Sequence, residues 1–228
     1  MALKVVLEIA PKRAFASALE WPGWSRGGKT ADEALDSLLA YAPRYAKVAH
    51  RAKVPFRAPA TIRGLDVVER LGGGSGTEFG VPSASAALEA EPVSAAELKR
   101  LVALLRAAWA TFDGAAKKAE GVSLRLGPRG GGRQVPKMVE HVREAEAAYL
   151  HQLGSRPPRG DAATMAALRR GFVTALTATA SGGEIPDPNK VKRPWGPRYA
   201  ARRSAWHALD HAWEIEDRSA PDDDSPHG

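Results

Sequence analysis

The chain has 228 residues, of which 44% are hydrophobic and 26% are charged, proportions that are typical of globular proteins and exclude a wholly disordered chain. It contains no cysteine, which excludes disulfides, cysteine nucleophiles and cysteine-bound zinc, so any metal needs His, Asp or Glu ligands. The formal net charge is +7, divided between both halves of the chain. Two basic runs, at residues 121–137 and 185–204, are typical of solvated cations in loops, and an anion-binding rim is the alternative. We expect no sequence-specific nucleic-acid binding.

The first ten residues fit neither a signal peptide nor a membrane span. Lys4 and Glu8 interrupt the apolar run, and Pro11 follows it directly. A secretory signal needs an uninterrupted apolar core, and a spanning helix needs about 20 apolar residues. We therefore expect a cytoplasmic protein without membrane contact.

Residues 1–80 are predicted to form a small domain that begins with a β-hairpin. Two stretches rich in apolar residues, Leu3 to Ile9 and Ala14 to Trp21, are separated by a short turn, which is the pattern of two antiparallel strands. Residues 54–68 have a mixed pattern that leaves room for another strand. The glycine cluster at residues 72–76 lacks the Lys-Ser/Thr pair of a phosphate loop and a following helical pattern, so it predicts a flexible turn.

A helix is predicted after the hairpin. Thr30 and Glu33 have the spacing of a capping box, and apolar residues follow at helical period. Pro43 lacks the N–H that a helix interior needs. We therefore expect a kink or an end at Pro43, before a second helical stretch from Tyr45 to Ala52.

The predicted fold class is α+β, with a four-helix bundle as its larger part. A stretch of small and polar residues indicates a linker at residues 81–93, the bundle is predicted at residues 94–218, and a flexible acidic tail at residues 219–228. The four helices open at a capping box with Ser94, after Pro136, at a cap provided by Asp161, and at Pro197.

Three histidines form the candidate metal site. His207 and His211 are four residues apart, so they lie on the same face of one helix. His141 flanks the apolar stripe of the helix that starts after Pro136. A single histidine in such a place is more often a satisfied or half-exposed residue, but three on apolar helix faces would be costly to bury without ligation. The remaining histidines are predicted at the surface or in the tail: His50, His151 and His227.

The C-terminal part of the chain, about residues 94–218, resembles the DinB/YfiT-like metalloprotein superfamily. The resemblance rests on the histidine of the second predicted helix and on the last predicted helix, which reads RRSAWHALDHAWEIEDR from Arg202 to Arg218. The resemblance implies a four-helix bundle in which His141, His207 and His211 hold a divalent metal. Zinc is the first choice, with nickel, iron or manganese as alternatives. It also implies a thiol-dependent transferase or isomerase, or a hydrolase, that acts on a small-molecule substrate, with a low-molecular-weight thiol as co-substrate.

The N-terminal segment resembles HicB-like antitoxin domains. The resemblance rests on LEWPGW at Leu19–Trp24 and GKTADEAL at Gly28–Leu35, and it covers about residues 3–50. It implies a compact strand, turn and helix module that gates the pocket, forms a homodimer or binds a partner. The usual DNA-binding segment of an antitoxin is absent after it, and the predicted bundle stands in its place.

Two further side chains of the last helix are candidates for a role in the reaction. Glu214 shares the face of His207 and His211 and is a candidate to orient a ligand or move a proton. Arg203 lies one turn before His207 and is a candidate to bind an anionic substrate. A surface or interhelical ion pair is the alternative for both, and it fits Arg203 better than Glu214. Asp210 is predicted to be solvated, and the tryptophans Trp195, Trp206 and Trp213 are predicted to pack the bundle.

The sequence therefore supports two hypotheses of different kinds. In the first, the metal activates a thiolate or a water molecule in an enzyme. In the second, the chain is a regulatory or binding protein that uses its HicB-like domain against a protein or RNA, and the metal only stabilises the fold.

Overall fold

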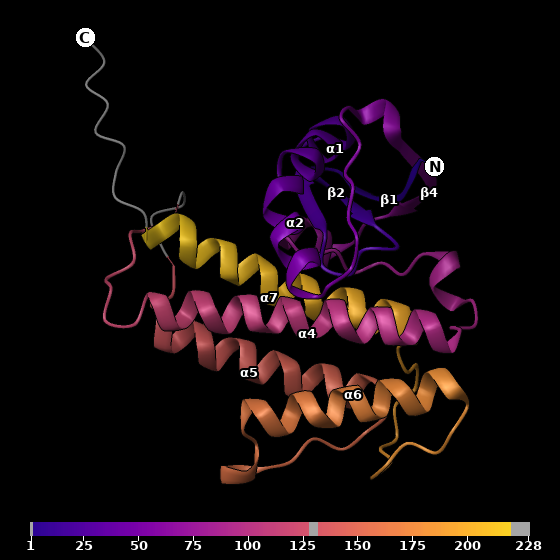
Figure 1. Ribbon diagram of the computed structural model, residues 1–228, viewed down its shortest axis with the longest axis vertical. Coiled ribbons are helices and arrows are strands. Elements are labelled where there is room, and N and C mark those ends of the chain that lie inside the picture. Colours follow the sequence, from indigo (N-terminus) through magenta and orange to yellow (C-terminus); the bar gives the residue numbers. More distant parts are fainter. Residues whose placement is uncertain (1, 128–131, 220–228) are drawn as a thin grey trace.

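The computed structural model describes residues 2–127 and 132–219, and within them the fold is α+β, as predicted (Figure 1). A four-stranded sheet and three helices form the N-terminal part, and four long helices form the C-terminal part. The strands are β1 (Leu3–Ala10), β2 (Arg13–Ala18), β3 (Ser25–Gly28) and β4 (Leu65–Gly72). The helices are α1 (Ala31–Ala40), α2 (Ala42–Arg51), α3 (Ser75–Phe79), α4 (Ala95–Lys118), α5 (Val135–Gln152), α6 (Met165–Ser181) and α7 (Pro197–Ser219).

The sheet has the strand order β3-β2-β1-β4. The predicted hairpin of β1 and β2 is confirmed, and β4 adds to β1 in parallel. The prediction that β2 reaches Trp21 is wrong: the chain turns after Ala18, whose N–H donates to Trp24 O at 2.9 Å. Gly23 in this turn has φ +90°, and a Cβ there would lie 2.7 Å from Leu209 Cδ1. Glycine is therefore required both by the backbone conformation and by the close approach to α7.

The helix predicted after the hairpin is confirmed. Thr30 Oγ1 accepts a hydrogen bond from the N–H of Glu33 at 3.1 Å, which caps α1. Helix α1 ends at Ala40, and α2 begins at Ala42 with Pro43 in its first turn, where the missing N–H leaves no bond unmade. The predicted break is present, but it lies at Tyr41, and α2 runs from Ala42 to Arg51 rather than from Tyr45 to Ala52. Trp24 fixes α1 to the sheet by donating a hydrogen bond from Nε1 to Leu38 O at 2.9 Å.

The glycine cluster leads into a short helix that the sequence did not predict. After Gly72 ends β4, the N–H of Gly73 donates to Ile9 O at 2.7 Å, and α3 follows. The prediction that no helix follows the glycines is wrong because a single turn of five residues is too short to show an apolar period.

The N-terminal part packs on α7 through aromatic contacts. The rings of Phe15 and Trp206 are 6.2 Å apart, and those of Tyr41 and Trp213 are 5.1 Å apart. Figure 1 shows this part on one side of α4 and α7, with α5 and α6 on the other. Trp206 and Trp213, predicted to pack the bundle, are buried where α7 meets the N-terminal part.

Of the capping residues predicted for the long helices, Ser94 is confirmed and Asp161 is not. Ser94 Oγ accepts a hydrogen bond from the N–H of Glu97 at 3.3 Å, as predicted for α4. The prediction that Asp161 caps α6 is wrong. Thr164 Oγ1 accepts from the N–H of Ala167 at 3.2 Å, and Asp161 lies in a preceding 3-10 turn. Threonine and aspartate are both good caps, so composition alone did not separate the two positions.

The segment predicted as a linker is fixed to the rest of the fold. It contains the 3-10 turn Ala87–Ala90, and its Glu89 pairs with Arg202 of α7 at 2.5 Å, with both side chains 2% exposed. Glu8 of β1 accepts hydrogen bonds from the N–H groups of Ser83 at 3.1 Å and Ala84 at 2.9 Å. These contacts tie residues 83–89 to both the sheet and α7.

Across residues 2–127 and 132–219, none of the helices has both the length and the apolar character that crossing a lipid bilayer requires. Of the predicted acidic tail at residues 219–228, Ser219 is the last residue of α7, and residues 220–228 lie outside the described residues.

Candidate metal centre

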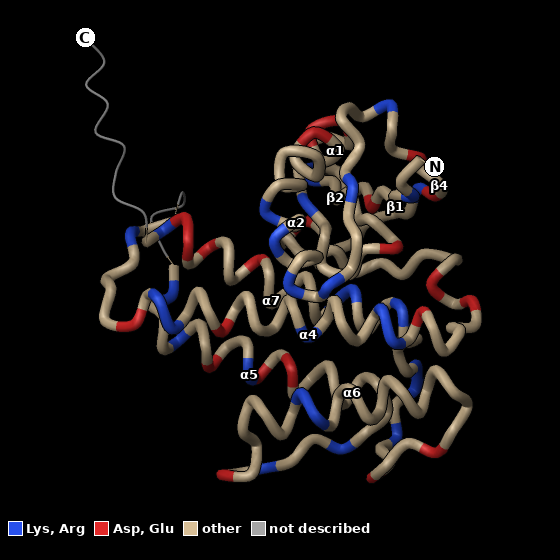
Figure 2. Tube along the Cα trace, viewed as in Figure 1, with Lys and Arg blue, Asp and Glu red and all other residues tan. Residues whose placement is uncertain are grey.

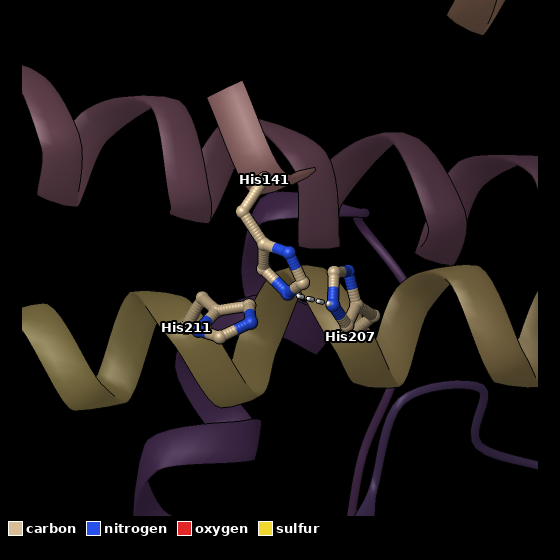
Figure 3. A group of neighbouring side chains, drawn as sticks. All are labelled: His141, His207 and His211. Carbon is tan, nitrogen blue, oxygen red and sulfur yellow. Dashed lines mark hydrogen bonds between the residues drawn. The ribbon is translucent and has the colours of Figure 1, made fainter. Parts of the chain in front are cut away.

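Helices α5 and α7 bring the three predicted histidines together. Helix α5 begins at Val135 with Pro136 in its first turn and His141 in its second, while His207 and His211 lie one turn apart on α7. Figure 3 shows the three rings pointing toward one another across the two helices. One potential ligand nitrogen from each ring can be chosen so that all three lie within 4.8 Å of one another.

The closest pair has the separation expected for ligands of a common metal. His141 Nε2 lies 3.2 Å from His207 Nε2 (Figure 3). Zinc–nitrogen bonds of 2.0 to 2.1 Å at a tetrahedral angle place two ligand nitrogens about 3.3 Å apart. The centres of the His207 and His211 rings are 4.6 Å apart. The residues therefore fit one divalent ion bound by three imidazoles.

The environment favours neutral imidazoles, which is the form that binds a metal. His207 is 8% exposed. Burial, with the positive charges of His211 and Arg203 beside it, lowers the pKa of His207 well below its ordinary value. Burial and the charge of His211 also lower the pKa of His141. Neutral rings keep a lone pair free, and imidazole suits zinc, nickel and iron.

Hydrogen bonds from Arg218 through Glu214 orient the ring of His211. Glu214 Oε2 lies 2.9 Å from His211 Nδ1, and Glu214 Oε1 accepts a hydrogen bond from Arg218 at 2.8 Å. Burial raises the pKa of the Glu214 carboxyl, but the bonds to His211 and Arg218 outweigh it and lower the pKa. An ionised Glu214 accepts the proton on Nδ1 and leaves Nε2 of His211 free for a metal.

Arg218 contacts the candidate site and was not predicted from the sequence. Its guanidinium donates to the backbone oxygens of Arg125 at 2.7 Å and Arg133 at 2.9 Å, in addition to Glu214. The spacing of four residues from Glu214 was a usable signal. The two carbonyl partners belong to the segment between α4 and α5, whose position does not follow from a local pattern.

Replacing Glu214 with glutamine is expected to weaken metal binding about 10- to 100-fold, because the neutral amide orients His211 less firmly and no longer increases its basicity. Competition with a chromophoric chelator measures this affinity. Glu216→Gln is the matched control, since Glu216 lies on the same helix and pairs with Arg44 at the surface. Equal affinities in both variants would contradict the role of Glu214.

The other candidates of α7 have different surroundings from those predicted. Asp210 is not simply solvated: it pairs with Arg26 of β3 at 3.0 Å, and burial raises its pKa. Arg203 is 9% exposed, and within residues 2–127 and 132–219 it makes no ion pair, so the alternative predicted for it is wrong. Its guanidinium carbon lies 4.7 Å from the centre of the Trp206 ring.

The remaining histidines lie apart from this group. His50 is exposed at the end of α2, as predicted. His151 is partly buried, and its Nδ1 contacts Asn189 Nδ2. His227 lies outside the described residues. The Trp195 ring is tilted against the Tyr149 ring, with ring centres 5.2 Å apart.

Comparison of the chain with known protein families, with curated proteins and with solved structures finds no match.

Proposed function

We propose that the chain is a DinB-like metal-dependent enzyme in which His141, His207 and His211 hold one divalent ion, with zinc as the first choice. The observation that carries this proposal is the convergence of three imidazoles from α5 and α7, two of them with Nε2 atoms 3.2 Å apart. A hydrogen bond between these two Nε2 atoms accounts for one pair of rings only, whereas a single ion engages all three.

The three imidazole ligands determine what chemistry a bound ion would supply. Three neutral ligands leave its full charge uncompensated, and such an ion lowers the pKa of a water molecule or thiol that occupies its remaining position. This supports a thiol-dependent transferase or isomerase, or a hydrolase. Because the chain contains no cysteine, a thiol has to come from a small-molecule co-substrate.

The chain's own groups have distinct tasks in this proposal. The imidazoles of His141 and His207 are kept neutral by burial, so they bind without first losing a proton. We assign Glu214 a positioning role, since both of its oxygens are engaged, one by His211 and one by Arg218. Proton transfer by Glu214 would require one of these bonds to break.

A second candidate function is a binding or regulatory protein whose metal is structural. The observation in its favour is the exposed edge of the HicB-like part: β4 ends the sheet, and Phe79 in α3 is 81% exposed. Exposed edge strands and apolar side chains are typical of sites that bind another protein, and a homodimer is one such assembly. Sequence-specific nucleic-acid binding is not part of this proposal, because Lys and Arg are interspersed with Asp and Glu over the molecule (Figure 2).

Cobalt-loaded protein separates the two functions. Titration with N-acetylcysteine is expected to produce a sulfur-to-cobalt charge-transfer band, because the uncompensated cation binds the thiolate. N-acetylserine is the matched control and is expected to produce no such band. If cobalt binds stoichiometrically but no band appears at saturating thiol, the thiol-dependent reaction is contradicted. If, in addition, the cobalt spectrum does not respond to pH or to added anions, the ion has no open position and the structural role is supported.

A further inference from the structure

Arg203 is a buried cation without an anionic partner in the described part of the chain. It is 9% exposed, and its Nη1 is buried with no hydrogen-bond partner. Other arginines of α7 are neutralised: Arg198 pairs with Glu97, and Arg202 pairs with Glu89. Burying an ion costs several kcal/mol unless it is paired. The absence of a pair at Arg203 therefore needs an explanation.

Two aromatic rings lie near the guanidinium of Arg203 but accept no hydrogen bond from it. Its carbon lies 4.7 Å from the centre of the Trp206 ring and 5.4 Å from that of Tyr149. Such cation–π contacts contribute only about 0.5 to 2 kcal/mol each and engage no N–H group. Trp206 Nε1 is a second buried donor without a partner in the described residues. Two unsatisfied donors therefore lie on consecutive turns of one helix.

This place adjoins the candidate metal centre. Arg203 precedes His207 by four residues, which places the two side chains on the same face of α7 about one turn apart. The Tyr149 ring, which contacts Arg203, also lies 5.7 Å from the His207 ring. A small molecule bound at the three histidines would thus extend one end toward Arg203.

We propose that Arg203 binds the carboxylate of the substrate or of the thiol co-substrate whose reacting group occupies the three-histidine site. This inference rests on the proposed function, and it specifies the substrate class as a small carboxylic acid. A guanidinium presents parallel N–H groups that match the planar carboxylate in a bidentate pair. The same geometry favours a planar carboxylate over a tetrahedral anion.

Nuclear magnetic resonance tests the anion site without requiring the metal. The Nε–H resonance of Arg203, assigned by its loss in Arg203→Met, is followed while propionate or inorganic phosphate is added to the metal-free protein. Propionate is expected to shift this resonance saturably, and phosphate to shift it less. A failure of both ions to shift it would overturn the proposal, and a stronger response to phosphate would overturn the carboxylate assignment.

The link to the metal centre is tested with zinc-loaded protein, whose metal content is measured first. Calorimetry compares 3-mercaptopropionate with its amide, which differs only in lacking the charge. The acid is expected to bind about 10- to 100-fold more tightly, the range typical of hydrogen bonds to charged groups, and Arg203→Met is expected to remove this preference. Arg198→Met is the control for a lost positive charge on the same helix and is expected to keep the preference.

The outcomes separate the two proposals. If wild-type protein binds no zinc, the three-histidine site fails, and the resonance titration still decides whether Arg203 binds carboxylate. If zinc binds and the acid has no advantage over the amide, the assignment of Arg203 fails while the metal site stands. Arg203→Met is also expected to melt no lower than the wild type, because it removes an uncompensated buried charge. A large loss of stability would indicate a structural role for Arg203 instead.

Discussion

His207→Ala is expected to abolish tight binding of one divalent metal per chain. Metal affinities of about 10 to 16 kcal/mol for four-ligand structural zinc sites imply about 2.5 to 4 kcal/mol for each ligand, which is a loss of about 70- to 900-fold in affinity. Isothermal titration with zinc measures the loss. Because the ion binds the native state only, zinc is expected to raise the melting temperature of the wild type and not of the variant.

The matched control for this substitution is His50→Ala, which removes an exposed imidazole at the end of α2. It is expected to leave both the stoichiometry and the affinity unchanged. Far-ultraviolet circular dichroism of the metal-free proteins shows whether His207→Ala retains the helices. A folded His207→Ala protein that still binds one zinc with wild-type affinity would refute the assignment of His207 as a ligand.

Glu89→Ala is expected to lower the free energy of unfolding by about 3 to 5 kcal/mol, the usual result of removing one partner from a buried ion pair. Arg202 Nε and Nη2 donate to the two carboxylate oxygens at 2.5 and 2.9 Å. Burial alone would lower the pKa of Arg202, but the charge of Glu89 raises it. Without Glu89 the guanidinium remains buried and charged. Urea denaturation measures the loss.

Two further variants separate the lost pair from the lost side chain. Glu216→Ala removes a carboxylate of α7 that is 46% exposed and pairs with Arg44, and it is expected to cost less than about 1 kcal/mol. The double variant Glu89→Met and Arg202→Leu removes both charges and is expected to recover most of the stability. If the double variant is as unstable as Glu89→Ala, packing rather than the unpaired charge causes the loss.

The features predicted correctly depend on residues that are only a few positions apart in the sequence. Thr30 and Ser94 cap their helices as expected, and the spacing of His207 and His211 places both rings on one face of α7. The approach of His141 from α5 was expected through the family resemblance and its apolar flank. The spacing of apolar residues along α5 does not determine which side of this helix faces α7.

The features that were not predicted depend on distant contacts. Strand β3 contains Arg26, Gly27 and Gly28, which have a weak strand propensity, and it becomes a strand by pairing with β2. Glu89 lies in a polar stretch that resembles a linker, and it is buried only because Arg202 lies opposite, 113 residues away in the sequence. Side chains of this kind acquire their role from a partner that the local sequence does not reveal.

X-ray absorption at the zinc edge tests the central claim most directly, because it reports the ligands of the bound ion. Protein loaded with one equivalent of zinc is predicted to show a first shell with three imidazole nitrogens, completed by a light atom. A shell with fewer than two imidazoles, or failure to retain one zinc per chain after dialysis, would contradict the three-histidine centre.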